Sequence, residues 1–166
     1  MIDLHDLPKR RGTRPRTTYT NPHTQLDQNA PAELVAQLAD RAFELPGVQE
    51  RPSLVSVPGA RALWLQENQI TGPPEAFMIG REFAHIHPLP DGSMHIALPR
   101  DVTDEAVAKG WAEPHPIAQM GYLPSTVVMV YGPRDSEELE IVFALVRAAH
   151  RAAAPDSDTE APNGRR

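Results

Sequence analysis

Three histidines stand close together in the middle of this 166-residue chain, at positions 85, 87 and 95. His85 and His87 lie two residues apart in one short, mainly apolar run, and His95 lies in a second. Residues 88–93 between the runs hold two prolines and an Asp-Gly step, which are typical of turns and predict a β-hairpin. Imidazoles gathered on such a hairpin could bind a transition metal or act as general bases near neutral pH.

The pairing of the two strands decides whether the three imidazoles can meet. If His85 lies opposite His95, the three histidines share one face with Phe83 and Ala97, and the other face is wholly apolar. A shift by one residue would mix polar and apolar side chains on both faces. We therefore predict the first register. Its apolar face consists of Ala84, Ile86, Met94, Ile96 and Leu98.

The composition excludes several kinds of protein. The length suits one domain with a substantial core, and the absence of cysteine excludes disulfides, thiolate catalysis and zinc fingers. No apolar run approaches the ~20 residues of a membrane span, and no signal peptide is visible, so we expect a cytoplasmic protein without a membrane partner. The net charge is -6 although the first 16 residues hold five basic side chains, so the rest is acidic, which argues against a nucleic-acid partner.

Upstream of the histidines, the pattern predicts one helix and a first hairpin. Apolar residues recur at helical spacing over residues 32–44, and a Pro-Gly pair follows them. Residues 53–57 and 61–66 are β-type runs joined at a second Pro-Gly pair, which is typical of a hairpin. We expect residues 76–79 to continue into the first histidine-bearing strand.

Downstream, the pattern predicts two helices separated by a strand. Asp101 is the expected cap of a short helix that ends near Gly110, and residues 111–116 are expected to form an irregular loop. The apolar residues 126–131 do not alternate with polar ones, which indicates a strand in the middle of the sheet. Asp135, with a glutamate three residues later, matches a capping box that opens a long amphipathic helix.

The order of these elements lacks a βαβ rhythm, so we predict an α+β fold: a mostly antiparallel sheet with helices packed on one face. Residues 31–152 form the single predicted domain. Residues 1–30, rich in Pro, Thr and Arg, are expected to be an extended or disordered basic arm that could wrap the domain, and residues 153–166 a disordered tail. Removal of residues 1–15 is expected to cost little stability.

Five further residues could take part in a site with the histidines. His115 and Glu113, on the loop after Trp111, could supply a second base or orient the first. Tyr131 and Arg134, at the end of the central strand, would suit an anionic oxygen. Each also has a structural interpretation, since a single histidine is commonly hydrogen-bonded scaffold and the arginine could pair with the acidic residues after it.

A metal site is the alternative use of His85, His87 and His95. Gly80-x4-His85-x-His87 comes within one residue of the first cupin motif, and Pro90-x-Gly92-x2-His95 echoes the second. The two motifs overlap here, however, and an aspartate in the turn replaces the cupin glutamate. Glu82 would point to the opposite face unless a bulge intervenes. We therefore expect no cofactor, with a divalent transition metal as the alternative, and we favour a structural role for His23.

Three sequence blocks resemble the luciferase domain of bioluminescent fungi and related luciferase-like proteins of bacteria and fungi. The likeness covers about residues 45–148, and its blocks are EFAHIHPLPDGSMHIALP, GWAEPHP and MVYGPRDSEELEIV. The resemblance implies an oxygenase that adds O2 to a hydroxylated α-pyrone without flavin or nicotinamide, with loss of CO2 in the light-emitting members. No apolar N-terminal anchor like that of the fungal proteins is visible, so membrane association is not expected. Most relatives make no light, so the resemblance carries over only the site residues.

The resulting hypothesis is a luciferase-like oxygenase that uses a histidine base and O2 on a small enolisable phenolic or α-pyrone-type substrate, without light emission. A metal-dependent cupin-like enzyme and a non-catalytic module that binds a small molecule or a partner are the alternatives. The oligomeric state is left open. The predicted catalytic residues are His85, His87, His95 and His115, and the predicted substrate-binding residues are Tyr131, Arg134, Glu113 and Trp111.

Overall fold

A computed structural model describes residues 1–155 and shows one antiparallel sheet of six strands in the order β1-β2-β3-β4-β6-β5. The predicted α+β class is confirmed. The strands are β1 (Val48–Pro52), β2 (Arg61–Leu65), β3 (Glu82–Ile86), β4 (Met94–Ala97), β5 (Ala112–Pro114) and β6 (Val127–Val130).

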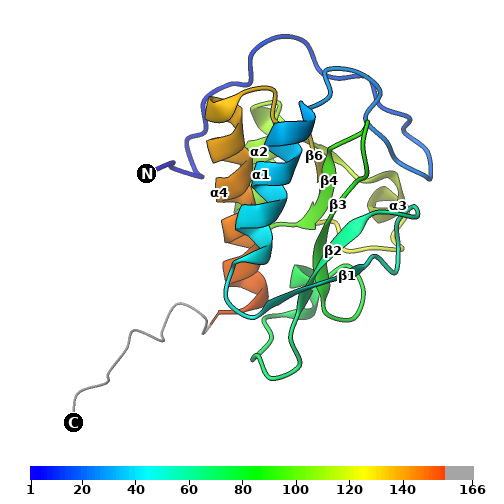
Figure 1. Ribbon diagram of the computed structural model, residues 1–166, viewed down its shortest axis with the longest axis vertical. Helices are drawn as coiled ribbons and strands as arrows, with labels where there is room; N and C mark the ends of the chain where they lie inside the picture. Colours follow the sequence, from blue (N-terminus) through cyan, green and yellow to red (C-terminus); the bar gives the residue numbers. More distant parts are fainter. Residues whose placement is uncertain (156–166) are drawn as a thin grey trace.

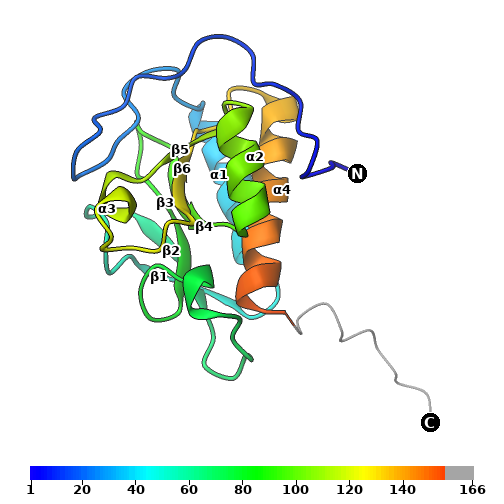
Figure 2. The same ribbon diagram turned by 180° about the vertical axis from the view of Figure 1, so that it is seen from behind.

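Three helices cover one side of the sheet: α1 (Ala32–Phe43), α2 (Arg100–Ala108) and α4 (Ser136–Ala153). The short α3 (Pro116–Gln119) lies on the other side (Figures 1 and 2). The largest hydrophobic cluster lies between the sheet and the three long helices, where leucines and valines of α1 and α4 meet the apolar side chains of β3, β4 and β6.

The predicted helices form because their apolar residues recur every three to four positions. In α1, Leu34, Leu38 and Ala42 are buried along one stripe. The start of α4 is fixed by Asp135, whose carboxylate accepts a hydrogen bond from the backbone N–H of Glu138 at 2.9 Å. The Glu138 carboxylate accepts from the backbone N–H of Arg134, which closes the capping arrangement.

The histidine hairpin has the predicted register, with His85 opposite His95. The face predicted for Phe83 was wrong. The pairing of β2 with β3 skips Phe83, so a bulge turns that ring into the hydrophobic core and leaves Glu82 on the histidine face. Ala97 keeps its predicted face.

Two predicted strands upstream are loops. Residues 53–57 connect β1 to β2 and expose Leu54, whereas the strand itself is the more polar Val48–Pro52 at the sheet edge. A run of β-prone residues is only a weak signal, because an edge strand tolerates charges and a connecting loop tolerates valine. Residues 76–79 enter a tight turn rather than β3, and Gly80 there has a φ of 53°.

Downstream, the structure changes two expected boundaries. The helix α2 begins at Arg100, after Pro99, so Asp101 lies in its first turn and is not its cap. Residues 111–116 are not an irregular loop throughout, since β5 pairs with β6 and α3 starts directly afterwards. As predicted, β6 lies inside the sheet, between β4 and β5.

The arm of residues 1–30 runs past the ends of the helices and on to the opposite side of the sheet (Figure 1). It contains no helix and no strand, only an isolated bridge between Thr17 and Gln25. Leu7 is 1% exposed, and the indole of Trp111 donates to the carbonyl of Pro8 at 2.7 Å. The expectation that residues 1–15 add little stability assumed that they bury almost no apolar area, and the burial of Leu7 shows that this assumption was wrong. Of the predicted tail, residues 156–166 lie outside the described part of the chain.

Candidate functional site

Four strands place one residue each in a line across the face of the sheet that α1 and α4 leave uncovered. His85 pairs with His95, His95 with Met129, and Met129 with Glu113. Directly opposed residues point to the same side of a sheet, so both imidazoles and the carboxylate face one way. His87 shares this side because it lies two residues after His85.

His95 is the centre of a cluster of five buried histidines. Its Nδ1 lies 3.0 Å from Nε2 of His85 and 3.1 Å from Nε2 of His87. Its Nε2 lies 2.9 Å from Nδ1 of His23, which the N-terminal arm brings to the sheet. The ring of His115 completes the cluster, with its centroid 4.2 Å from that of His95. The predicted meeting of three imidazoles is confirmed and enlarged to five.

The outer nitrogen of His87 is fixed by the hairpin turn. Its Nδ1 lies 2.9 Å from the Ser93 hydroxyl, which itself donates to Asp91. Since the Ser93 proton is used on Asp91, the serine oxygen accepts the Nδ1–H of His87. Burial alone would raise the pKa of Asp91, but the hydrogen bonds from His87 and Ser93 outweigh it and lower that pKa. The turn thus holds a carboxylate behind the imidazole.

The outer nitrogen of His85 has the same kind of support from a different loop. Ser53 donates to Glu82 at 3.2 Å, and the Ser53 oxygen lies 3.4 Å from Nδ1 of His85. The second oxygen of Glu82, Oε1, is buried and has no hydrogen-bond partner within residues 1–155. The β-bulge that was not predicted is what brings this carboxylate to the histidine face.

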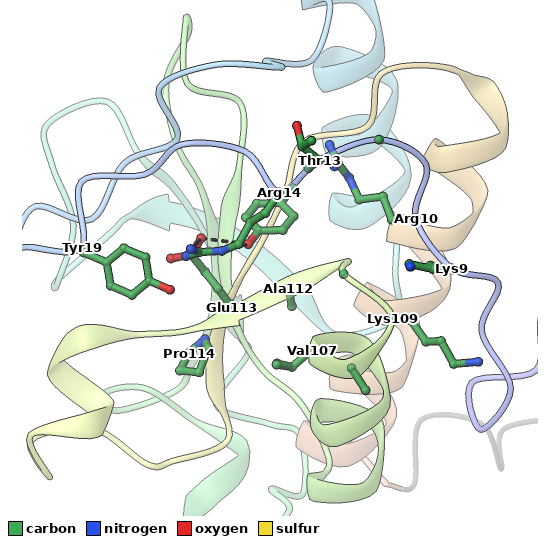
Figure 3. A pocket seen from close by; sticks show the side chains of 14 residues that line it. Lys9, Arg10, Thr13, Arg14, Tyr19, Val107, Lys109, Ala112, Glu113 and Pro114 are labelled. Carbon is green, nitrogen blue, oxygen red and sulfur yellow. Dashed lines mark hydrogen bonds and ion pairs between the residues drawn. The ribbon is translucent and has the colours of Figure 1, made fainter.

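Glu113 supports His23. One of its oxygens lies 2.9 Å from Nε2 of His23, and the hydroxyl of Thr17 donates to the same oxygen at 2.9 Å. The other oxygen accepts from the Tyr131 hydroxyl and pairs with Arg14, both at 2.9 Å. Figure 3 shows Arg14 folded over Glu113. Burial would raise the pKa of Glu113, but these donors outweigh it and lower the pKa, so the group is ionised.

His115 has a different tautomer from its neighbours. It caps α3, and its Nδ1 accepts a hydrogen bond from the backbone N–H of Ile117 at 3.0 Å. A neutral imidazole that accepts at Nδ1 carries its proton on Nε2. His115 therefore offers an N–H group to the cluster, whereas the outer protons of His23, His85 and His87 point away from it.

Burial keeps His85, His95 and His115 neutral. Loss of solvation, assisted by the other histidines, lowers the pKa of His95 well below its ordinary value. The same causes lower the pKa of His115 to about 4. Burial also lowers the pKa of His85, although Glu82 opposes the change. These three rings therefore hold lone pairs, not positive charges, at neutral pH.

Two clefts flank the cluster. One, of about 290 Å³, is lined by His23, His87, His95 and His115, with residues 55–57 as part of its wall. The other, of about 450 Å³, lies beneath the arm and is lined by Arg10, Arg14, Tyr19, Glu113 and Tyr131, among others (Figure 3). Glu113 contributes to the second cleft and binds a histidine of the first.

The structure brings six of the eight predicted site residues together and leaves two apart. His85, His87, His95 and His115 form the cluster, and Glu113 and Tyr131 join it through hydrogen bonds. Trp111 donates to the carbonyl of Pro8, and the guanidinium of Arg134 binds Glu138. Trp111 and Arg134 therefore have structural partners and do not meet the histidines.

Sequence reasoning missed His23, the fifth member of the cluster. It lies in a polar arm 62 residues before His85, and no periodic pattern links the two. Thr17 and Ser53 donate hydrogen bonds to the supporting carboxylates, and no sequence pattern pointed to them either.

Chemically, the cluster can bind a metal or move protons. Two sets of three histidines have nitrogen atoms within 4.8 Å of one another: His85, His87 and His95, and His23, His95 and His115. The described sheet is one layer with its three long helices on one side, unlike the two packed sheets of a cupin. Any metal chemistry here would thus be built on a different scaffold.

Comparisons with known proteins confirm the resemblance found in the sequence blocks. Residues 80–149 match the family model of the Luciferase domain. The chain is 32% identical to the luciferases of Armillaria ostoyae and Armillaria gallica, and 31% identical to that of Neonothopanus nambi. Each match covers 88% of this chain, which spans 60% of the length of these curated relatives.

No solved structure shows a significant match to the chain. None of the helices within residues 1–155 is both long and apolar enough to cross a membrane.

Proposed function

Starting from the match to the Luciferase domain, we propose that this protein is an oxygenase that combines O2 with a small enolisable phenolic or α-pyrone-type substrate, without flavin or nicotinamide. The similarity to fungal luciferases supports the reaction class. One structural observation carries the proposal: five buried histidines line or underlie a cleft of about 290 Å³. Such a cleft is at the lower limit of typical small-molecule sites, so the substrate is small.

The first step is ionisation of the substrate, and His23 is the base. Its Nε2–H donates to Glu113 at 2.9 Å, and its Nδ1 lines the cleft 2.9 Å from Nε2 of His95. The substrate hydroxyl replaces His95 as the donor to this Nδ1. A carboxylate behind an imidazole fixes the tautomer and stabilises the imidazolium that forms. The loss of the enolic proton to His23 leaves an electron-rich carbon that donates two electrons to O2. A C–O bond forms, and the double bond of O2 becomes the O–O single bond of a peroxide anion.

His115 stabilises the resulting anion. Its Nδ1 is occupied by the backbone N–H of Ile117, so its Nε2–H is available to donate. A donor fixed before the reaction stabilises developing negative charge without reorganisation. The general-base role first assigned to His85, His87, His95 and His115 thus passes to His23, with His115 as donor.

Oxygen uptake tests the proposal. An oxygen electrode would record the rate with hydroxylated α-pyrones and catechols, and ¹⁸O2 would show whether the label enters the product. We expect uptake by the wild type and a loss of about 10² to 10⁴-fold in His23→Ala, since that is the usual contribution of a general base. His5→Ala, at an exposed position, is the matched control.

A non-catalytic binding module would give the opposite result. The hydroxylated pyrone would then bind reversibly, with no oxygen consumed and no label transferred, and the oxygenase proposal would be abandoned.

A further inference from the structure

We propose that Nε2 of His85, Nε2 of His87 and Nδ1 of His95 form a site for a divalent first-row transition metal ion such as Fe²⁺, Co²⁺ or Zn²⁺. The use of this ion in catalysis rests on the proposed function, whereas its binding can be measured without any substrate. The sequence favoured a site without metal, and the present proposal takes up the alternative of a divalent metal ion.

The three nitrogen atoms already lie close together. Nδ1 of His95 lies 3.0 and 3.1 Å from the other two, and all three lie within 4.8 Å of one another. Zinc binds imidazole nitrogen at about 2.0 to 2.1 Å, so nitrogens at tetrahedral positions on one ion are about 3.3 Å apart. A metal ion therefore needs only small shifts of the side chains.

Two separate serine and carboxylate pairs turn the lone pairs inward. The pair Ser93 and Asp91 holds the outer nitrogen of His87, and Ser53 with Glu82 lies behind that of His85. Histidines that bind metals almost always donate their other N–H to a carboxylate, a carbonyl or water. Two such supports in one cluster are unnecessary for imidazoles that only fill space.

When His85 and His87 carry their protons on the outer nitrogens, next to Ser53 and Ser93, neutral imidazoles cannot satisfy one another here. His95 carries one proton, on either Nδ1 or Nε2. If the proton is on Nε2, it serves His23 and leaves three lone pairs facing one another. If it is on Nδ1, two acceptors share it and the lone pairs of His95 and His23 meet at 2.9 Å. A second proton on His23 would relieve only that last contact, whereas a metal ion uses all three inward lone pairs.

The charges around the cluster also call for a cation. Glu82, Asp91 and Glu113 are buried behind the histidines. Within residues 1–155, Arg14 is the one lysine or arginine that pairs with any of these three. Oε1 of Glu82 has no hydrogen-bond partner at all in that part of the chain. Buried charge without compensation is costly, and a divalent ion would offset it.

The other set of three histidines is less suited to a metal. His115 accepts a backbone hydrogen bond at Nδ1, so its Nε2 carries a proton. To bind a metal through Nε2, His115 would have to give up its hydrogen bond from the backbone N–H of Ile117, and α3 would lose its N-terminal cap. The structure thus assigns the metal to the site of His85, His87 and His95.

The position of this site suits an oxygenase. His87 and His95 line the cleft of about 290 Å³, and His85 lies behind them. An ion held by three histidines keeps at least one position free. That position would face the cleft, where a water molecule, O2 or a substrate oxygen could bind. Protein sites with three ligands on one side of an iron ion use their open positions in this way.

Titration with Co²⁺ alone tests the site. The full chain, freed of metals with a chelator, would be titrated while its visible absorption is recorded, and the bound metal counted by elemental analysis. We expect one ion per chain, with bands in the visible range that Zn²⁺ abolishes. His85→Ala and His87→Ala should each weaken binding on the order of 100-fold or more, and Ser93→Ala about 10 to 100-fold.

Two controls separate ligand loss from misfolding. His150→Ala removes a buried histidine from the helix side of the sheet and should keep the affinity for Co²⁺. His115→Ala should also keep it, and an equal loss there would instead favour the set with His23. The proposal fails if the wild type binds no stoichiometric Co²⁺ or Zn²⁺, or if His85→Ala, with a native circular dichroism spectrum, binds Co²⁺ like the wild type.

Metal binding and oxygen uptake can fail separately. Stoichiometric Co²⁺ or Zn²⁺ with no oxygen uptake by Fe²⁺-loaded protein would keep the site and reject the oxygenase. Oxygen uptake that a chelator leaves unchanged, in protein without metal, would keep the oxygenase and reject a catalytic role for the metal, while the Co²⁺ titration alone decides whether the site exists.

Discussion

The two faces of the sheet are built on different principles. On the helix face, β3, β4 and β6 present apolar side chains that pack with α1 and α4 in the hydrophobic core. On the other face, the hairpin of β3 and β4 presents histidines whose partners are loop serines and the carboxylates of the turn and of β3, and the arm adds His23, which binds Glu113 of β5. Neighbouring residues of one strand, such as His95 and Ile96, therefore serve different purposes. The stability of the fold and the chemistry of the site should be separable by mutation.

The largest effect on stability should come from the helix face. Ile96 is fully buried there, so Ile96→Ala leaves a cavity and should reduce the free energy of unfolding by about 2 to 5 kcal/mol, as measured in urea. Its affinity for Co²⁺ should stay within a few-fold of the wild-type value. If Co²⁺ binding disappears while the variant remains folded, the two faces are not independent.

A somewhat smaller effect is expected from the N-terminal arm. Leu7 is as buried as a core residue, and its backbone N–H donates to Glu105 at 2.9 Å. Leu7→Ala should cost about 2 to 3 kcal/mol of unfolding free energy, at the lower end for a buried leucine because the arm can rearrange. Leu54→Ala is the control, since that side chain is exposed and its removal should change stability by less than about 0.5 kcal/mol. Equal effects would mean that the arm does not pack on the domain.

The smallest of these effects should be at the start of α4. Asp135→Ala removes the hydrogen bond to the backbone N–H of Glu138 and should cost about 0.5 to 2 kcal/mol in a thermal or urea unfolding experiment. Asp104→Ala, at an exposed position inside α2, should cost nothing because alanine is the better helix former. A loss confined to the second variant would contradict this account of the cap.

The helix face could be predicted from the sequence because its signals are local and periodic. The spacing in α1 and α4, the cap at Asp135 and the register of His85 with His95 all follow from which residues must be buried together. Boundaries were less certain where edge strands are polar. The strand Val48–Pro52 carries one buried residue and was overlooked in favour of the loop that follows it.

The histidine face could be predicted only in part. The hairpin gave His85, His87 and His95, because strand pairing is a local property. The bulge that moves Glu82 to this face depends on how β2 fits against β3, which composition does not reveal. His23 depends on the path of an arm without periodic structure. Contacts between segments so far apart have no signature in a single sequence.

One comparison tests the central claim that the histidine face is a reaction centre. His95 and His150 are both buried, at 4% and 2% exposure, and lie on opposite faces of the sheet. We predict that His95→Gln lowers the rate of oxygen uptake with the best hydroxylated pyrone by about 10²-fold or more, because it disrupts the centre of the cluster. His150→Gln, measured at a temperature where both variants are folded, should retain the wild-type rate. Equal rates in the two variants would contradict the claim.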